Sequence, residues 1–349
     1  MRDFTKEDIG AIMREAERMD ALLKKPIECG NILQNRLVAN MFFEPSTRTN
    51  QSFQAASARL GAKTLQFYPQ TSSIAKGENF SDTIRMADGY ADAIILRHAF
   101  EGAARLAADI SANPVINAGD GANQHPTQTL IDLYTIKKLK GRIFGLKVAL
   151  FGDLRHARTM HSLLFGLSMF GAEILLISPP SLSMDNAYIK EAETRFKAKI
   201  TAASTSDLSQ ADILYVCRVQ KERFRSQKEA KSAERAFKVD EHLLHSLKED
   251  LVILHPLPRV SEISPSVDSD PRAKYFDQAK NGVPVRMAVL ASCILNKGPA
   301  KQVEGKSTHF SCKNKACILR VQPAPKEGVL GEDGVVRCSY CEQPAKKQR

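Results

Sequence analysis

No apolar stretch of this sequence approaches the roughly 18 residues that a helix needs to span a bilayer. The chain begins Met1-Arg2-Asp3-Phe4-Thr5-Lys6-Glu7, which lacks the apolar core of a signal peptide. There is also no internal repeat and no long low-complexity tract. These absences favour a cytoplasmic protein that does not associate with membranes. With 349 residues, two domains and a small appendage are the expected organisation.

The formal charge of +11 is unevenly distributed along the chain. Residues 297–349 contain eleven Lys and Arg against five Asp and Glu, so +6 of the charge lies in this segment. A basic surplus is compatible with nucleic acid, with anionic small substrates or with a solvated tail, and the tail is the default interpretation. Charge alone therefore does not assign a function.

The seven cysteines fall into two groups. Cys29, Cys217 and Cys293 are scattered, and we interpret them as small buried apolar side chains. Four more, Cys312, Cys317, Cys338 and Cys341, are clustered near the end. A disulfide framework is not expected in a cytosolic chain, so the cluster needs another explanation.

The periodicity of apolar residues predicts an α/β fold. Residues 5–25 have helical spacing and should open the chain with a helix. Short apolar runs then alternate with helical patterns, which indicates βαβ units and a parallel sheet. The expected pairs are strand 37–43 with helix 49–60, strand 93–96 with helix 101–109, and strand 115–117 with helix 127–138.

A second strand series predicts a second doubly wound domain. Its expected strands are 146–153, 173–177, 211–216 and 251–255. Lys140-Gly141-Arg142 interrupts the apolar pattern between the two series. The apolar segment 283–295 reads as a helix late enough to return to the first domain. We therefore expect domains at 1–138 with 283–296 and at 139–282, a linker at 297–308, and a small domain at 309–349.

In an open parallel sheet, ligands bind beyond the carboxyl ends of the strands. Glu44-Pro45-Ser46-Thr47-Arg48-Thr49 follows the first expected strand and leads into a helix. Hydroxyls, a guanidinium and free backbone N–H groups at a helix N-terminus suit a phosphate, although the glycines of a P-loop are missing. Arg97 and the segment Gly119 to Gln128 follow two further strands. Arg97, His125 and Gln128 should therefore converge on one crevice.

Each of these features has an ordinary structural explanation when it is taken alone. Ser or Thr before a helix is usually a cap, Arg after a strand is usually on the surface, and His-Pro is usually a turn. Their occurrence at successive strand ends favours a binding site. In the second domain, Arg158 and Arg218 also follow strands, and paired arginines suit a dicarboxylate substrate.

These residues resemble a known family. Residues 1–296 are similar to the catalytic chain of aspartate carbamoyltransferase, and the motifs that carry the resemblance are Ser46-Thr47-Arg48-Thr49, Lys76-Gly77-Glu78, Arg97-His98, His125-Pro126-Thr127-Gln128, Arg158-Thr159, Arg218-Val219-Gln220 and His255-Pro256-Leu257-Pro258-Arg259. The related ornithine enzymes use a Ser-Met-Gly loop and a His-Cys-Leu-Pro segment, and neither occurs here.

The resemblance implies transfer of a carbamoyl group from carbamoyl phosphate to the α-amine of L-aspartate, giving N-carbamoyl-L-aspartate and phosphate in de novo pyrimidine biosynthesis. It implies that the phosphate is bound by Ser46, Thr47, Arg48, Thr49 and Arg97. It places the carbonyl oxygen on Thr49, Arg97 and His125, and the carbamoyl nitrogen on Gln128 and the backbone carbonyls of Pro256 and Leu257. It implies that Arg158, Thr159, Arg218 and Gln220 bind the carboxylates of aspartate.

The resemblance further implies a shared active site. Ser72 and Lys76 match the pair that enters from a neighbouring subunit, so a homotrimer or a larger assembly is expected. Arg48, Thr49, Lys76, Arg97 and His125 are the expected catalytic residues. Preorganised donors would stabilise the developing oxyanion, and no catalytic cofactor is expected. The departing phosphate can accept the proton of the amine.

The four clustered cysteines predict a structural zinc site with one Zn²⁺ per chain. Cys312 and Cys317 form one short chelating loop, Cys338 and Cys341 form another, and twenty residues separate the loops. Little else in residues 297–349 could supply a core, so the metal should largely fold this segment.

Two interpretations of the zinc domain are open. Small four-cysteine domains often bind nucleic acid, and the flanks are basic. The segment instead resembles the zinc domain of the aspartate carbamoyltransferase regulatory chain, which docks on the catalytic chain, and this resemblance implies an assembly or stabilising element that binds no nucleic acid. The nucleotide-effector domain of that regulatory chain is missing here, so we expect no ATP or CTP control by this polypeptide. An inactive scaffold is a further alternative, but every charged position that the chemistry needs is present.

Overall fold

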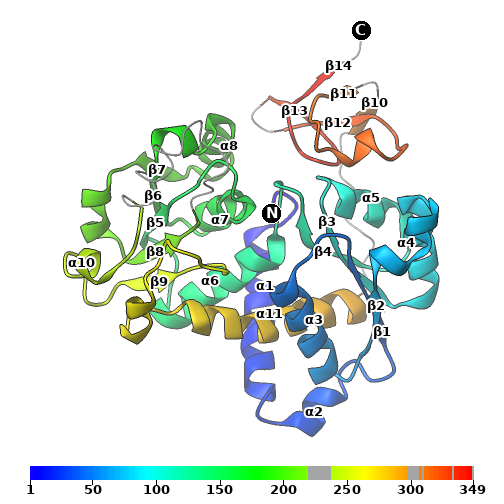
Figure 1. The fold of residues 1–349 in the computed structure, drawn as a ribbon, viewed down its shortest axis with the longest axis horizontal. Coiled ribbons are helices and arrows are strands. Elements are labelled where there is room, and N and C mark those ends of the chain that lie inside the picture. Colours follow the sequence, from blue (N-terminus) through cyan, green and yellow to red (C-terminus); the bar gives the residue numbers. More distant parts are fainter. Residues whose placement is uncertain (219–236, 297–305, 309, 332–333, 348–349) are drawn as a thin grey trace. The chain divides into compact units, whose positions relative to one another are not determined.

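The computed structural model describes residues 1–218, 237–296, 306–308, 310–331 and 334–347 (Figure 1). The chain divides into two compact units. The unit that we call the N-terminal unit contains residues 7–127 and 282–349, and the central unit contains residues 1–6 and 128–281. Within the described ranges, no helix is long and apolar enough to cross a membrane.

The N-terminal unit is built on a parallel sheet with strand order β2-β1-β3-β4. Its strands are β1 (Leu37–Phe42), β2 (Lys63–Phe67), β3 (Ala93–His98) and β4 (Val115–Asp120). The connecting helices are α3 (Thr47–Arg59), α4 (Phe80–Tyr90) and α5 (Ala103–Ile110), and α1 (Lys6–Leu22) and α2 (Pro26–Gly30) precede the sheet. Strand order reverses between β1 and β3, so this unit has its topological switch point there.

The central unit holds a second parallel sheet with order β7-β6-β5-β8-β9. The strands are β5 (Lys147–Phe151), β6 (Glu173–Ile177), β7 (Lys199–Ala202), β8 (Ile213–Val216) and β9 (Val252–Leu254). Its helices are α6 (Pro126–Lys140), α7 (Arg158–Met169), α8 (Asn186–Phe196) and α10 (Glu241–Leu244). The switch point lies between β5 and β8. Here Gly152 has a φ of 118°, and a Cβ atom on it would lie 2.2 Å from the carbonyl oxygen of Cys217, so only glycine fits.

The last long helix, α11 (Tyr275–Leu295), begins eight residues earlier than the sequence pattern indicates and contains Pro284. Its residues from Gly282 onward belong to the N-terminal unit. There, Arg286 donates a hydrogen bond to Ser52 of α3 over 2.9 Å, and its guanidinium lies over the ring of Phe53. The second half of α11 therefore packs against α3 of the N-terminal unit.

The C-terminal segment forms two small antiparallel sheets. One contains β10 (Lys306–Thr308), β12 (Glu327–Leu330) and β13 (Val336–Cys338), and the other contains β11 (Phe310–Cys312) and β14 (Ala345–Lys347). Buried side chains of this segment, Ile318 and Tyr340 among them, share one apolar cluster with β3 and α5. These side chains of the C-terminal segment are therefore part of the hydrophobic core of the N-terminal unit.

Candidate active site

The first group of candidate residues lies at the switch point of the N-terminal unit. Helix α3 begins at Thr47, and Ser46 occupies the N-cap position without using its side chain as a cap. Thr47 and Arg48 are exposed and Thr49 is buried. An uncapped helix N-terminus beside an exposed guanidinium provides backbone N–H donors and positive charge, which together suit a phosphate.

Arg97 lies near the end of β3, at the same edge of the sheet. The sequence pattern ends the second expected strand at Leu96, but β3 continues to His98 because Arg97 still pairs with Phe42 of β1. The buried Arg97 guanidinium donates to the carbonyl oxygen of Ala118 over 3.2 Å and forms an ion pair with Glu44 over 3.1 Å. The carboxylate of Glu44, which sequence reasoning missed, therefore already neutralises part of the charge that an anion would meet.

His125 stands at the start of α6 and is 5% exposed. The loop before it is held by Asp120, whose carboxylate accepts from the backbone N–H of Gln124 at 3.0 Å and of Gly102 at 2.8 Å. Burial raises the pKa of this carboxyl above its ordinary value. A buried acceptor with several backbone and amide donors fixes the loop that carries His125.

His98, the neighbour of Arg97, has a structural position. Its ring lies against Phe43, Phe80 and Phe100, with centroids 4.9, 5.2 and 5.7 Å away. Its Nδ1 accepts from the backbone N–H of Phe100 over 3.0 Å. Burial lowers the pKa of His98 to about 4, which outweighs the opposing charge of Glu44. The ring is therefore neutral and apolar in its contacts at neutral pH.

Ser72 and Lys76 lie on a short 3-10 turn rather than at a strand end. Ser72 donates to the carbonyl oxygen of Pro69 over 2.9 Å and accepts from the N–H of Ile74 over 3.3 Å. Lys76 ends the turn (Ser73–Lys76), and Gly77 follows with a φ of 96°. The exposed Lys76 side chain is thus presented on a turn that is stabilised by its own hydrogen bonds.

In the central unit, Gln128 belongs to a buried hydrogen-bonded group around Asp132. Gln128 Nε2 donates to Asp132 Oδ1 over 2.8 Å, and Tyr215 donates its hydroxyl to Oδ2 over 2.9 Å. Burial raises the pKa of Tyr215, and the adjacent Asp132 raises it further. Sequence reasoning missed Asp132, although its spacing of four residues from Gln128 puts both on one helix face.

Pro256 and Leu257 follow β9 in a turn that His255 organises. The backbone N–H of Leu257 donates to His255 Nδ1 over 2.8 Å, and His255 Nε2 lies 2.8 Å from Glu262 Oε1. His255 and Glu262 are both buried. Leu257 has a φ of 51° and a cis bond to Pro258. The turn is therefore fixed by side-chain contacts rather than by regular structure.

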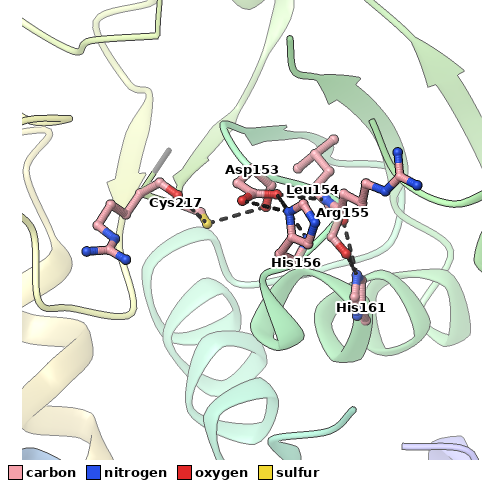
Figure 2. A network of polar contacts seen from close by, with 7 residues as sticks. Asp153, Leu154, Arg155, His156, His161 and Cys217 are labelled. Carbon is pink, nitrogen blue, oxygen red and sulfur yellow. Dashed lines mark hydrogen bonds and ion pairs between the residues drawn. The ribbon is translucent and has the colours of Figure 1, made fainter. Parts of the chain in front are cut away.

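The second switch point carries the loop between β5 and α7 (Figure 2). Figure 2 shows Asp153 directed toward His156, with the ring nitrogen Nδ1 3.2 Å from the carboxylate. The buried Asp153 also accepts from the backbone N–H groups of Arg155 and His156. His161 Nε2 lies 3.1 Å from the carbonyl oxygens of Leu154 and Arg155. This network fixes the backbone immediately before Arg158.

Arg158 and Thr159 begin α7 and are half-buried, and Arg218 is exposed just beyond β8. Cys217 precedes Arg218, and its thiol donates to the carbonyl oxygen of Asp153 over 3.5 Å (Figure 2). The two arginines thus follow the two strands that flank the switch point of this sheet. Gln220, the fourth candidate on this side, lies outside the described residues.

The four clustered cysteines meet in space. Their sulfur atoms all lie within 4.8 Å of one another, with Cys312 and Cys341 3.5 Å apart and Cys317 and Cys338 4.0 Å apart. None of them is in a disulfide. Tetrahedral bonds of about 2.3 Å to Zn²⁺ would place the sulfurs about 3.8 Å apart. The donor set therefore fits a tetrahedral thiolate metal site.

The cysteine cluster is docked on the loop between β3 and α5. Glu101 donates its N–H to the carbonyl oxygen of Ala316 over 2.8 Å and accepts from the N–H of Ile318 over 2.9 Å. Asn314 Nδ2 donates to Glu101 Oε2 over 2.7 Å. A Cβ atom on Gly121 would lie 2.7 Å from Glu101 Cγ, so the docking residue also packs against the loop that leads to His125.

Two family profiles match the chain. "Aspartate/ornithine carbamoyltransferase, carbamoyl-P binding domain" matches residues 1–138, and "Aspartate/ornithine carbamoyltransferase, Asp/Orn binding domain" matches residues 144–293. Residues 294–349, which include the four cysteines, lie beyond both matched ranges.

Curated relatives and solved structures agree with these profiles. The chain is 48% identical over 295 residues to the aspartate carbamoyltransferase catalytic subunit of Archaeoglobus fulgidus, which covers 84% of this chain and 97% of that one. The catalytic subunit of M. jannaschii aspartate transcarbamoylase is 44% identical, with a TM-score of 0.80 over 86% of this chain and 98% of that one.

The Trypanosoma cruzi aspartate transcarbamoylase solved with carbamoyl phosphate and aspartate is 35% identical, with a TM-score of 0.78 over 83% of this chain and 93% of that one. The two matched profiles span both sheets and the loops at both switch points. The chain therefore belongs to the aspartate/ornithine carbamoyltransferase family.

Proposed function

We infer that this chain is an aspartate carbamoyltransferase, which transfers the carbamoyl group of carbamoyl phosphate to the α-amine of L-aspartate. The observation that carries this function is the presence of anion-binding groups at the switch point of each sheet. Helix α3 and Arg97 provide them in the N-terminal unit, and Arg158 and Arg218 provide them in the central unit. Arginine forks suit the two carboxylates of aspartate, and a helix N-terminus suits a phosphate.

On the carbamoyl phosphate side, we assign the phosphate to Ser46, Thr47, Arg48, Thr49 and Arg97. His125 and Arg97, together with Thr49, donate to the carbonyl oxygen on which negative charge develops during attack. Arg97 is held by Ala118 and Glu44, and the loop that carries His125 is held by Asp120, before the substrate arrives. Such preorganisation is the main source of oxyanion stabilisation. Gln128 and the backbone carbonyls of Pro256 and Leu257 accept hydrogen bonds from the carbamoyl nitrogen.

On the aspartate side, Arg158, Thr159, Arg218 and Gln220 bind the carboxylates and orient the neutral amine. Attack of the amine on the carbonyl carbon forms the new C–N bond, and the C–O bond to phosphate breaks. The departing phosphate accepts the proton that the amine loses. This leaves N-carbamoyl-L-aspartate and inorganic phosphate.

The aspartate assignment is tested by Arg158→Lys, because lysine keeps the charge but loses the two-point fork. We expect KM for aspartate to rise at least about tenfold while KM for carbamoyl phosphate stays within about twofold. Arg155→Lys is the matched control, since Arg155 is an exposed arginine on the same loop. If Arg158→Lys and Arg155→Lys change KM for aspartate equally, or if Arg158→Lys leaves it unchanged, Arg158 does not bind aspartate.

We also propose that Cys312, Cys317, Cys338 and Cys341 bind one structural Zn²⁺ per chain. The mutual distances of the four sulfur atoms support this assignment. Thiolate ligands persist in a reducing compartment, so we propose a cytoplasmic location as well. Zinc bound here would hold the strands β11 and β13 together and present Asn314 to Glu101.

We further propose that the active enzyme is a homotrimer or a larger assembly in which Ser72 and Lys76 complete the site of a neighbouring subunit. The exposed lysine on its own hydrogen-bonded turn supports this role. Mixing an inactive Lys76→Ala chain with an inactive His125→Ala chain tests it. Recovery of activity in the mixed assembly is expected, and its complete absence after verified subunit exchange would contradict a shared site.

A further inference from the structure

Asp132 is a fully buried carboxylate in the interior of α6. Gln128 and Gln278 donate their Nε2 groups to its Oδ1 over 2.8 and 2.6 Å, and Tyr215 donates its hydroxyl to Oδ2 over 2.9 Å. Tyr215 and Gln278 are 0% and 1% exposed, whereas Gln128 is half-buried. A carboxylate in such a site is expensive to bury unless it is hydrogen-bonded, and these three donors supply that compensation.

The carboxylate of Asp132 determines the orientation of the Gln128 side-chain amide, that is, whether its NH₂ group or its oxygen faces Asp132. An ionised carboxylate only accepts hydrogen bonds, so Gln128 must present its NH₂ group to Asp132. The amide oxygen of the half-buried Gln128 is then directed away from Asp132. That oxygen can accept a hydrogen bond from a substrate N–H group, but it can offer nothing to a methyl group or to another acceptor.

The same carboxylate also reaches the turn after β9 through Gln278. Gln278 donates its Nε2 group to Asp132, and its Oε1 accepts a hydrogen bond from the backbone N–H of His255 over 2.8 Å. His255 in turn accepts the N–H of Leu257 on Nδ1 over 2.8 Å. Asp132 therefore fixes the polarity of the Gln278 amide as it does that of Gln128. The backbone of the His255–Leu257 turn is tied to the interior of α6 by hydrogen bonds in series.

We propose that Asp132 is a positioning residue that makes the site select a substrate with an amide nitrogen, by fixing the Gln128 amide and, through Gln278, the His255–Leu257 turn. The proposal rests on the function assigned above to Gln128, Pro256 and Leu257. Its consequence is discrimination between carbamoyl phosphate and acetyl phosphate. These two acyl phosphates differ in that an NH₂ group replaces a CH₃ group.

Asp132→Asn is the discriminating substitution, because it keeps the size of the side chain and removes its exclusive acceptor character. The amide that it introduces can turn its NH₂ group toward Gln128, which then presents its own NH₂ group to the substrate. The measured quantity is the preference for carbamoyl phosphate, taken as its kcat/KM multiplied by the inhibition constant of acetyl phosphate. We expect Asp132→Asn to lower this preference at least about tenfold, mainly through carbamoyl phosphate.

Gln128→Met and the double variant complete the experiment on the full chain. Gln128→Met should lower the preference by a similar factor, and Asp132→Asn should add less than about twofold in that background, because coupled residues are not additive. An unchanged preference in Gln128→Met would overturn the function assigned to Gln128 and this proposal with it. A lowered preference in Gln128→Met with an unchanged one in Asp132→Asn would overturn the proposal alone.

Circular dichroism and thermal denaturation show whether Asp132→Asn folds. If it does not, Gln278→Met serves as the second variant, because it breaks the link between Asp132 and His255 and leaves the contact between Gln128 and Asp132 possible. A preference lowered at least about threefold in Gln278→Met supports the positioning of the turn. An equal weakening of kcat/KM for carbamoyl phosphate and of inhibition by acetyl phosphate, which leaves the preference unchanged, would contradict it.

Discussion

Asn314 donates its side-chain amide to the carboxylate of Glu101 over 2.7 Å, although the two residues are 213 positions apart in the chain. Glu101 is also bound through both of its backbone groups to residues Ala316 and Ile318 of the cysteine segment. The contact joins the segment beyond the end of both family profiles to the loop between β3 and α5, and Glu101 on this loop packs against Gly121 of the loop that leads to His125.

Glu101→Ala should weaken this docking more than Glu101→Gln does. Alanine leaves the side-chain amide of Asn314 without its acceptor, whereas glutamine keeps an amide oxygen there. Leaving one such group unsatisfied costs about 1–3 kcal/mol. We expect faster tryptic cleavage within residues 306–347 and a lower midpoint of thermal unfolding for the alanine variant. Equal protection of both variants would show that the backbone contacts alone hold the segment.

Gly102 is a second docking position, with a φ of 83°. A Cβ atom on it would lie 2.6 Å from the carbonyl carbon of Tyr340. Gly334 has a φ of 74°, and a Cβ atom on it would meet no described residue other than its chain neighbours within 4 Å. Gly334→Ala therefore serves as a control for the backbone strain alone. Gly102→Ala should destabilise by about 1–3 kcal/mol more than Gly334→Ala in urea denaturation. Equal destabilisation would mean that the close approach to Tyr340 is easily relieved.

Metal analysis tests the cysteine site. Purified protein should contain one zinc per chain, and Cys338→Ser should contain less than about half of that under a competing chelator, since a tetrahedral site loses one of four ligands. Cys293→Ser is the matched control because Cys293 lies outside the cluster. Thiol titration of the chelated protein should detect the four released cysteines. Full zinc retention by Cys338→Ser would exclude Cys338 as a ligand.

The lowered pKa of His98 predicts that the protein loses stability in acid. Its pKa in the folded chain is lowered to about 4 by burial, from an ordinary value of 6.5. Below pH 6.5 the unfolded chain therefore binds a proton that the folded chain excludes, and stability falls as pH drops from 6.5 toward 4. The free energy of unfolding should be lower by about 3 kcal/mol once the pH is below the folded-state pKa of His98. His98→Phe should flatten the dependence of unfolding free energy on pH in this window, whereas an unchanged slope would assign the effect elsewhere.

His125→Ala tests the oxyanion assignment. Loss of one preorganised donor should lower kcat at least about a hundredfold without unfolding the protein. His242→Ala removes an exposed histidine of α10 and serves as the control. Near-normal turnover of His125→Ala would contradict the role of His125.

Much of the fold follows from local sequence patterns. The buried strands β1, β3 and β5 are mostly apolar, and the prediction of two parallel α/β sheets is confirmed. The pattern does not predict β2, because its residues are half-exposed and form no apolar run. It also places the start of α11 too late because Pro284 resembles a helix start, yet the helix continues through it.

The sequence predicts those residues of the candidate site that directly follow a strand. The rule that ligands bind beyond the carboxyl ends of strands locates Ser46, Arg97 and Arg158. It does not locate Asp132 or Glu101, because the hydrogen-bond partners of these carboxylates are distant in sequence. It locates Glu44 but does not reveal the ion pair of Glu44 with Arg97 on the neighbouring strand. Tyr215, for example, lies 83 positions from Asp132. The roles of the site residues and the domain boundaries stay predictions.

The most direct test of the central claim is the rate of carbamoyl transfer to L-aspartate and to L-ornithine, measured on purified, zinc-quantified protein with carbamoyl phosphate. We predict formation of N-carbamoyl-L-aspartate with stoichiometric release of phosphate, and a kcat/KM for aspartate that exceeds that for ornithine by at least about a thousandfold, since the arginines suit carboxylates and repel a second amine. Transfer to ornithine at an equal or higher kcat/KM would contradict the account.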